Sequence, residues 1–232
     1  MRNPTPVSAG AMSPESDGPG SPGPAPRGLA AGGAGLRFIP GYLQRPAQEE
    51  LLAAVHEIMR VAPLYTPRMP KSGRPLSVRM TNCGPLGWMT DAAGYRYQPI
   101  HPETGEPWPP IPAILLAAWR DLSEYPHPPQ ACLVNVYGPA ARMGLHQDRD
   151  EEDMTAPVVS LSLGDSCLFR IGGGKRTDPT STLRLASGDA VVLGGGARLA
   201  FHGVDRIIAG SSTLLPEGGR INLTLRRVTR PP

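Results

Sequence analysis

The stretch RINLTLR, residues 220–226, alternates hydrogen-bonding and aliphatic side chains without a break. Because successive side chains of a β-strand point to opposite faces, its polar residues share one face and its aliphatic residues share the other. The polar face carries Arg220, Asn222, Thr224 and Arg226. The pattern favours a strand whose polar face is turned away from solvent. The alternative is an exposed basic edge strand, because charged side chains often protect sheet edges.

From Cys132 onward, six further short runs are rich in apolar and β-branched residues. Turn-forming GGGK, SGD, GGG and EGG punctuate this half of the chain. Seven strands in about 95 residues is the density of an antiparallel sandwich or barrel. The runs are CLVNVY, VVSLSL, CLFRI, TLRLA, AVVL and RLAFHGV. In the last of them, we expect His202 near the end of the strand.

Two segments upstream have the spacing of amphipathic helices. PAQEELLAAVHEIMRV, residues 46–61, sets its aliphatic residues on one side, and Pro63 ends the run. IPAILLAAWRDL, residues 111–122, does the same, with Pro112 near its start. Helices upstream of a β-rich C-terminal half predict an α+β architecture.

The composition changes sharply near residue 36. Of residues 1–35, 25 are Pro, Gly, Ala or Ser, which do not bury a core. We therefore expect a disordered tail over residues 1–35 and one folded domain over residues 36–232. A functional tail is the alternative, although Arg2 and Arg27 are its only basic residues.

Charge and cysteine content narrow the function classes. Lys and Arg total 23 against 20 Asp and Glu, so nucleic-acid binding needs local support beyond the net charge of +3. Cys83, Cys132 and Cys167 form no CxxC pair, which argues against a disulfide framework or a structural zinc site. Without an apolar run of membrane-spanning length or a secretory signal, we expect a soluble cytoplasmic protein.

Three common catalytic motifs do not fit. IGGGKRT, residues 171–177, has glycines like a phosphate-binding loop, but Arg176 stands where that loop requires Ser or Thr. We predict a hairpin turn there instead. The chain contains neither the HExxH motif of zinc proteases nor the GxSxG motif of α/β-hydrolases.

The stretch GLHQDRDEEDM, residues 144–154, carries the first candidate ligands. In an extended segment His146 and Asp148 project from the same face, and we expect His202 to supply a third ligand across the sheet. Two His and one carboxylate form the facial triad of non-haem Fe(II) oxygenases. The alternative is a solvated acidic surface turn that happens to contain a histidine.

The two arginines of RINLTLR suit a small dicarboxylate. A guanidinium binds a carboxylate through two parallel hydrogen bonds, so Arg220 and Arg226 would hold its two ends. In NVY, Asn135 and Tyr137 share one strand face and offer an amide and a phenol to the same ligand.

Several blocks of the chain together resemble the AlkB family of Fe(II)- and 2-oxoglutarate-dependent dioxygenases, and within it the bacterial type that repairs alkylated nucleobases. The resemblance runs from about Met80 to Arg227, in family order and spacing. The blocks are MTNCGPLGW, GYRYQPIHP, ACLVNVYGPAARMGLHQDRDE, APVVSLSLG, KRTDP, SGDAVVLGG, RLAFHGV and RINLTLR. Leu193 and Gly144 depart from the pattern, which commonly has Trp and Ser there.

The resemblance implies a double-stranded β-helix, a jelly-roll or cupin-like core over about residues 131–228. Helices upstream would buttress the core, and a nucleotide-recognition lid would span about residues 80–110. The implied iron ligands are His146, Asp148 and His202. The implied 2-oxoglutarate residues are Arg220 at the distal carboxylate, supported by Asn135, Tyr137 and Asn222, and Arg226 nearer the metal.

The resemblance also implies a substrate site. The damaged base would stack between Trp88 and His146, and Asp150 would contact its exocyclic amine. Tyr95, Tyr97 and Arg176 match further contacts to substrate. The alternative for the aromatic residues is a cluster that packs under a long loop. We expect Glu151, Glu152 and Asp153 to form a solvated turn.

The implied reaction is oxidative demethylation of bases such as 1-methyladenine and 3-methylcytosine, preferably in single-stranded DNA. It would use Fe(II), 2-oxoglutarate and O2 and release succinate, CO2 and formaldehyde. We expect a monomer. The alternatives are a related oxygenase that acts on RNA or tRNA, on a protein or on a small molecule, and a catalytically silent nucleic-acid-binding protein of the same fold.

Overall fold

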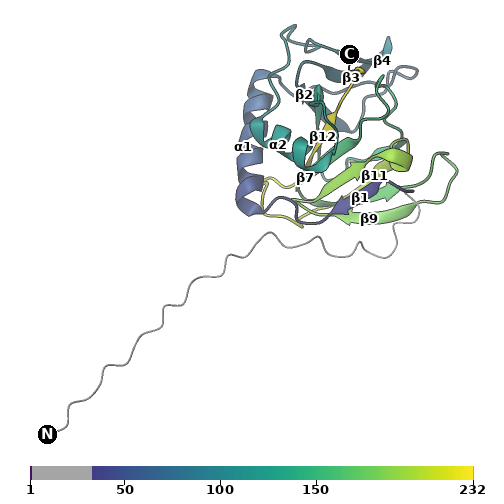
Figure 1. The fold of residues 1–232 in the computed structure, drawn as a ribbon. Coiled ribbons are helices and arrows are strands. Elements are labelled where there is room, and N and C mark those ends of the chain that lie inside the picture. The colour runs from purple at the N-terminus through teal and green to yellow at the C-terminus, as the bar shows by residue number, and fades with distance from the viewer. Residues whose placement is uncertain (2–32, 232) are drawn as a thin grey trace.

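The computed structural model describes Met1 and residues 33–231, so the prediction for the tail lies almost wholly outside the described residues. The described part of the chain forms twelve strands, two α-helices and a 3-10 turn (Figure 1). The strands make two antiparallel sheets and a separate hairpin. Neither α-helix in this part combines the length and the apolar character of a membrane span.

The larger sheet has six strands, and the alternating RINLTLR stretch lies inside it. The strand order is β1 (Leu36–Ile39), β10 (Ala190–Leu193), β7 (Val158–Gly164), β12 (Arg220–Arg226), β5 (Ala131–Tyr137) and β2 (Val78–Cys83). Strand β12 is hydrogen-bonded to β5 on one side and to β7 on the other. The interpretation of this stretch as an exposed edge strand is therefore wrong.

The smaller sheet has four strands. Its order is β6 (Met143–His146), β11 (His202–Ile208), β8 (Ser166–Ile171) and β9 (Ser181–Leu185). Strands β8 and β9 pair across the GGGK segment, as the hairpin-turn prediction requires. His202 begins β11, so the prediction that it ends a strand is wrong. The residues before it form the 3-10 turn η2 (Gly195–Ala197), and the Arg198 side chain bonds to carbonyl oxygens in the interior.

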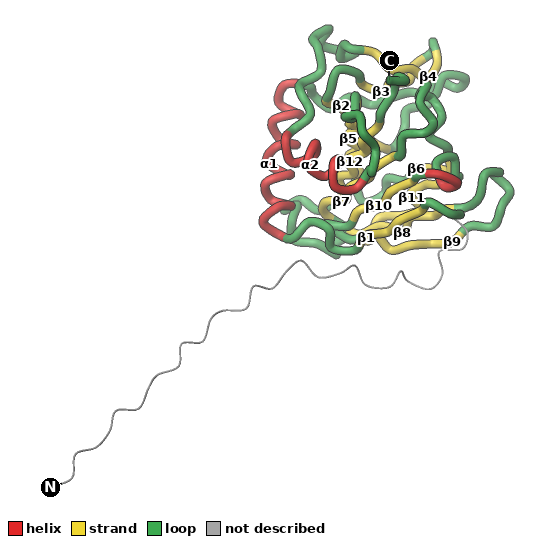
Figure 2. Tube along the Cα trace, viewed as in Figure 1, coloured by secondary structure: helices red, strands yellow, loops and turns green. Residues whose placement is uncertain are grey.

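Side-chain alternation gives the larger sheet two different faces. On β12, Ile221, Leu223 and Leu225 join a buried cluster with residues of both helices. Arg220 and Arg226 point to the opposite face. Helices α1 (Arg45–Val61) and α2 (Ala113–Leu122) cover the apolar face, as Figure 2 shows. The predicted double-stranded β-helix with buttressing helices is confirmed.

A second apolar cluster fills part of the space between the two sheets. Val158 and Leu193 of the larger sheet pack with Phe169, Ile171 and Leu185 of the smaller sheet. The space between the sheets is therefore lined by apolar side chains in one part and by the polar side chains of β12 in another.

Strands β3 (Gly87–Asp91) and β4 (Gly94–Gln98) form the separate hairpin. Trp88 on β3 pairs with Tyr97 on β4, and the rings of Trp88 and Tyr95 stack with their centroids 5.8 Å apart. The aromatic residues assigned to a lid thus lie on a paired hairpin, which holds them in a fixed relation to one another.

Candidate metal centre and substrate cavity

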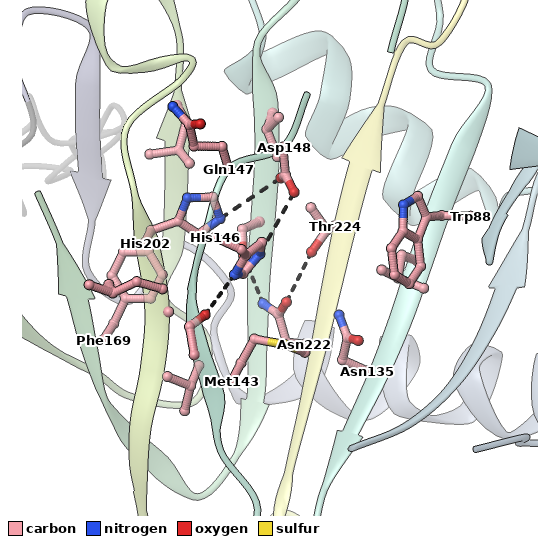
Figure 3. A pocket seen from close by; sticks show the side chains of 18 of the residues that line it. Trp88, Asn135, Met143, His146, Gln147, Asp148, Phe169, His202, Asn222 and Thr224 are labelled. Carbon is pink, nitrogen blue, oxygen red and sulfur yellow. Dashed lines mark hydrogen bonds and ion pairs between the residues drawn. The ribbon is translucent and has the colours of Figure 1, made fainter. Parts of the chain in front are cut away.

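A cavity of about 590 Å³ is lined by residues of both sheets and of the β3–β4 hairpin (Figure 3). Twelve of the thirteen site residues expected from the sequence line it, and so do Gly144 and Leu193. The twelve are Trp88, Tyr95, Asn135, Tyr137, His146, Asp148, Asp150, Arg176, His202, Arg220, Asn222 and Arg226. The fold therefore gathers segments that are far apart in the sequence around one space.

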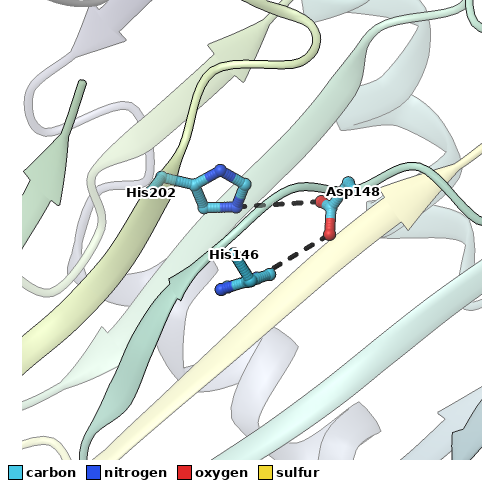
Figure 4. Close-up of side chains that lie close together, drawn as sticks. All are labelled: His146, Asp148 and His202. Atoms are coloured by element: carbon cyan, nitrogen blue, oxygen red, sulfur yellow. Dashed lines mark ion pairs between the residues drawn. The ribbon is translucent and has the colours of Figure 1, made fainter. Parts of the chain in front are cut away.

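The pairing of β6 with β11 brings the two histidines together. His146 and His202 are direct register partners, and their ring centroids lie 4.5 Å apart. Gly203 permits this close approach, because a Cβ there would lie 2.5 Å from the Met143 carbonyl oxygen. Asp148 follows the end of β6 by two residues and points at both rings (Figure 4).

The protonation of the two rings suits metal binding. The Nδ1 atoms of His146 and His202 lie 3.0 and 2.9 Å from the carbonyl oxygens of Gly144 and Ala200. Because a carbonyl only accepts, each Nδ1 carries the proton, and each Nε2 keeps a free lone pair. These Nε2 atoms lie 3.8 and 3.9 Å from the Asp148 carboxylate oxygens. One ligand atom from each residue lies within 4.8 Å of the others, which fits one metal ion.

Charge holds Asp148 in its ionised form. Burial by itself raises its pKa, but the charge of Arg226 and the two nearby histidines outweigh burial and hold the pKa well below its usual range. The Arg226 Nη2 donates to Asp148 Oδ2 at 2.9 Å. Burial is the main cause that lowers the pKa of His202 to about 4. At neutral pH, Asp148 is a carboxylate and His202 a neutral imidazole, and these are the ligand forms of both groups.

Unpaired polar atoms mark where an anion fits. Among the described residues, three buried side-chain atoms have no hydrogen-bond partner: Asn135 Oδ1, Arg220 Nε and Arg226 Nη1. All three belong to cavity residues. An unpaired buried polar group costs about 1–3 kcal/mol, and more when charged. A dicarboxylate that accepts from both guanidinium groups would remove that cost for Arg220 Nε and Arg226 Nη1, so these two donors fit 2-oxoglutarate.

Two serines that the sequence interpretation did not include support this polar face. Ser162 accepts from Arg220 Nη2 at 2.6 Å, and Ser160 accepts from Asn222 Nδ2 at 2.7 Å. Both lie in VVSLSL on β7, beside β12. The alternation of serine with aliphatic residues in that run was the available signal, and it is the same pattern as in RINLTLR.

Another part of the cavity lining carries the aromatic and acidic side chains. Trp88 Nε1 donates to Asp150 Oδ2 at 2.8 Å, which fixes the carboxylate beside the indole. Tyr95, stacked on Trp88, is 49% exposed and so belongs to the open side. Arg176 donates to the Leu145 carbonyl oxygen at 2.8 Å. This wall offers an aromatic face and a hydrogen-bond acceptor to a planar ligand.

Three expectations about this region need correction. Tyr97 does not line the cavity; its side chain is half-buried and its hydroxyl donates to Glu151. Glu151 is buried and paired with Arg198 at 2.9 Å, not part of a solvated turn. Asp153 is buried and accepts hydrogen bonds from Thr155. Of the three acids expected in a solvated turn, only Glu152 is exposed. The partners of Glu151 lie elsewhere in the fold, so local sequence did not reveal them.

Arg198 is a further residue that the sequence interpretation missed. It is 3% exposed, and its guanidinium binds the Ala156 and Asp148 carbonyl oxygens at 2.8 and 2.6 Å as well as Glu151. A lone arginine among small and apolar residues in GGGARLA was the only local signal.

The chain is similar in sequence to known proteins. Residues 35–226 match the family model described as the 2OG-Fe(II) oxygenase superfamily. An alpha-ketoglutarate-dependent dioxygenase AlkB homolog of Caulobacter vibrioides is 55% identical over 194 residues, which are 84% of this chain and 88% of that protein. The alpha-ketoglutarate-dependent dioxygenase AlkB of Escherichia coli is 42% identical over 155 residues, 63% and 69% of the two chains.

A solved structure agrees with the fold. The structure of OsALKBH1 has a TM-score of 0.70 and 31% identity, and the match covers 83% of this chain and 96% of that chain. The family model spans nearly all of the folded chain, and a relative over most of its length is more than half identical. The chain therefore belongs to the AlkB family, and it is an Fe(II)- and 2-oxoglutarate-dependent dioxygenase that uses O2 as co-substrate.

Proposed function

We propose that this dioxygenase removes methyl groups from ring nitrogens of nucleobases such as 1-methyladenine and 3-methylcytosine, preferably in single-stranded DNA. One observation carries the proposal: the candidate metal ligands and the Trp88–Tyr95 aromatic pair line the same cavity. A base held on that aromatic wall lies in the same space as the metal. We assign the catalytic domain to residues 36–232 and leave the tail of residues 1–35 outside it.

The metal ligands in this proposal are His146, Asp148 and His202. Iron bound there, with 2-oxoglutarate and O2, supplies the oxidation of the methyl carbon, which leaves as formaldehyde while succinate and CO2 are released. The protein's own part is to present the two Nε2 atoms and a carboxylate. The Gly144 and Ala200 carbonyl oxygens and Arg226 hold them in place.

Arg220 binds the distal carboxylate of 2-oxoglutarate in this proposal, and Arg226 binds nearer the metal. The free Nε of Arg220 and the free Nη1 of Arg226 support these roles. Asn135 and Tyr137 complete the pocket from β5 and Asn222 from β12. Burial raises the pKa of the Tyr137 phenol, so it stays neutral and able to donate.

The base stacks on Trp88 and His146, and its exocyclic amine donates to Asp150. The bond from Trp88 Nε1 supports the last role, because it aims one carboxylate oxygen and leaves the other free to accept. Tyr95 and Arg176 contact the neighbouring nucleotides. Tyr97, which the resemblance included among substrate contacts, donates to Glu151 and positions the hairpin.

A preference for single strands follows from the cost of base extrusion. The base must leave its stack to reach a cavity of this kind, and a methylated Watson–Crick edge already weakens pairing. Arg142, Arg149, Lys175 and Arg176 are exposed. These cations offer contacts to backbone phosphates near the cavity rim.

The runner-up is an RNA or tRNA oxygenase, since the same cavity accepts a base from either polymer. A tRNA demethylase of Schizosaccharomyces pombe is 45% identical over 63 residues, and a DNA N(6)-methyladenine demethylase of Arabidopsis thaliana is 44% identical over 68 residues. Both matches cover less than a third of this chain. A catalytically silent binder is disfavoured, because all three candidate ligands and both arginines line the cavity.

One experiment tests the proposal. The protein is loaded anaerobically with Fe(II) and 2-oxoglutarate, exposed to O2, and given methylated single-stranded DNA, duplex DNA or RNA. Formaldehyde should form in step with succinate, fastest with single-stranded DNA, while an unmethylated oligonucleotide gives none. Faster demethylation of RNA than of DNA would favour the RNA or tRNA oxygenase instead. Succinate without demethylation of any nucleic acid refutes a nucleobase substrate.

A further inference from the structure

We propose that Glu151 is a positioning residue that links the β3–β4 hairpin to the metal ligand Asp148. The side chain of Glu151 is 2% exposed, and both of its carboxylate oxygens are engaged. Oε2 accepts from Arg198, while Oε1 accepts from Tyr97 and lies 3.5 Å from Arg226 Nε. Glu151 therefore contacts two arginines that hold Asp148 and one tyrosine of the hairpin.

The first link runs from Glu151 to the metal ligand. Arg226 donates to Asp148 Oδ2 through Nη2 at 2.9 Å and through Nε at 3.3 Å. Arg198 holds the same residue by its backbone, because its Nη1 donates to the Asp148 carbonyl oxygen at 2.6 Å. Both the carboxylate and the main chain of Asp148 are thus held by cations that Glu151 holds in turn.

The second link runs from Glu151 to the cavity's aromatic wall. Tyr97 lies on β4 directly opposite Trp88 on β3. Trp88 lines the cavity and donates to Asp150. A shift of the Tyr97 hydroxyl thus moves the strand pair that carries the aromatic wall. Among the described residues of the hairpin, Tyr97 is the one that is hydrogen-bonded to Glu151.

Opposite charges hold the residues around Glu151 and Asp148 together. Asp148, Glu151, Arg198 and Arg226 form a buried group of two anions and two cations, each less than 10% exposed. Removing one charge leaves an opposite charge unpaired in the interior, which is strongly destabilising. The four side chains therefore shift together when a metal ion binds the Asp148 carboxylate. Tyr97 transmits that response to the hairpin.

This inference rests on the proposed metal site but on no nucleic-acid substrate. It predicts that metal and 2-oxoglutarate binding order the hairpin before any substrate is present. By linkage, a substrate that orders the hairpin strengthens metal and 2-oxoglutarate binding by the same factor.

The test compares amide hydrogen exchange of residues 87–98 without ligand and with Ni(II), which does not turn over, plus 2-oxoglutarate. In the wild type, exchange in the hairpin should slow by at least about fivefold. Tyr97→Phe should still bind Ni(II) but lose this response, because only the hydroxyl contact to Glu151 is removed. Tyr95→Phe, on the same strand without that contact, should retain the response.

A second measurement separates positioning from a purely structural role. Glu151→Gln should weaken Ni(II) binding by about 10–100-fold, the usual effect of removing a partner of a metal ligand. Glu152→Gln changes the exposed neighbouring acid and should bind Ni(II) as the wild type does. A purely structural Glu151 would lower the melting temperature and leave the affinity of the folded protein unchanged.

The outcomes separate the two proposals. If the wild type binds no Ni(II), the metal-site assignment fails and the link fails with it. If the wild type binds Ni(II) but the hairpin does not respond, the link alone is refuted. It is refuted equally if Tyr97→Phe responds as the wild type does, or if Glu151→Gln binds Ni(II) as tightly as the wild type.

Discussion

His146 and His202 face each other across paired strands, with ring centroids 4.5 Å apart and Nδ1 atoms turned away to backbone carbonyl oxygens. This relation depends on the register of β6 against β11. Two imidazoles that donate outward through Nδ1 present both Nε2 atoms to Asp148. The metal centre is thus built into strand pairing, and changes that move β6 should act on metal binding first.

Gly203→Ala tests the close approach of these strands. The added methyl group would lie 2.5 Å from the Met143 carbonyl oxygen, so β6 must move away from β11. We expect Mn(II) affinity to fall by at least about tenfold, as when support of a metal ligand is lost. Calorimetric titration measures it. Gly138→Ala, where a Cβ meets nothing within 4 Å, is the matched control and should bind Mn(II) normally.

Asp148→Ala should abolish Fe(II) binding and turnover together. It also removes the closer of the two carboxylates that pair with the buried Arg226 guanidinium, a loss of about 3–5 kcal/mol in the free energy of unfolding. Urea denaturation measures the stability, and succinate formation measures the turnover. Full activity in this variant would show that Asp148 is not a metal ligand.

Arg220→Ala should act chiefly on 2-oxoglutarate. Truncating one partner of a buried charge pair costs about 2 kcal/mol or more, so the KM for 2-oxoglutarate should rise at least about 30-fold. Arg184→Ala, at an exposed position of β9, should not change it. An unchanged 2-oxoglutarate requirement in Arg220→Ala contradicts the anchoring role.

Trp88→Ala should weaken binding of the methylated oligonucleotide by about 1–3 kcal/mol, because a stacking surface is lost. Trp88→Phe keeps a ring and removes only the bond to Asp150, so it should lose less affinity. Fluorescence anisotropy of a labelled oligonucleotide measures both. Equal affinity of the wild type and Trp88→Ala contradicts stacking on this residue.

Leu223→Ala tests the helix-covered face of the larger sheet. Leu223 is fully buried between β12 and the helices, so truncation should reduce the free energy of unfolding by about 2–5 kcal/mol. Leu199→Ala, at a position 39% exposed, should cost much less. The measurement is a pair of urea denaturation curves. A small loss at Leu223 would show that this face is loosely packed.

The sequence predicted the features that depend on local periodicity. The alternation in RINLTLR placed Arg220 and Arg226 on the face that lines the cavity, and both helices lie where the spacing of apolar residues indicated. The alternation of serine with aliphatic residues in VVSLSL likewise places Ser160 and Ser162 on one face of their strand. His146 and Asp148 were expected on one face with His202 as a third ligand, and the family resemblance implied the same three residues.

What the sequence alone determined is both helices, seven of the strands and which of their side chains share a face, because backbone geometry sets those periods residue by residue. Tertiary structure decided which charges are buried. Glu151 looked like part of a solvated turn, and Tyr97 like a substrate contact, until Arg198 and Arg226 were brought beside them. A charge is buried only where a partner from another segment compensates its desolvation, and that partner is not visible in the local sequence.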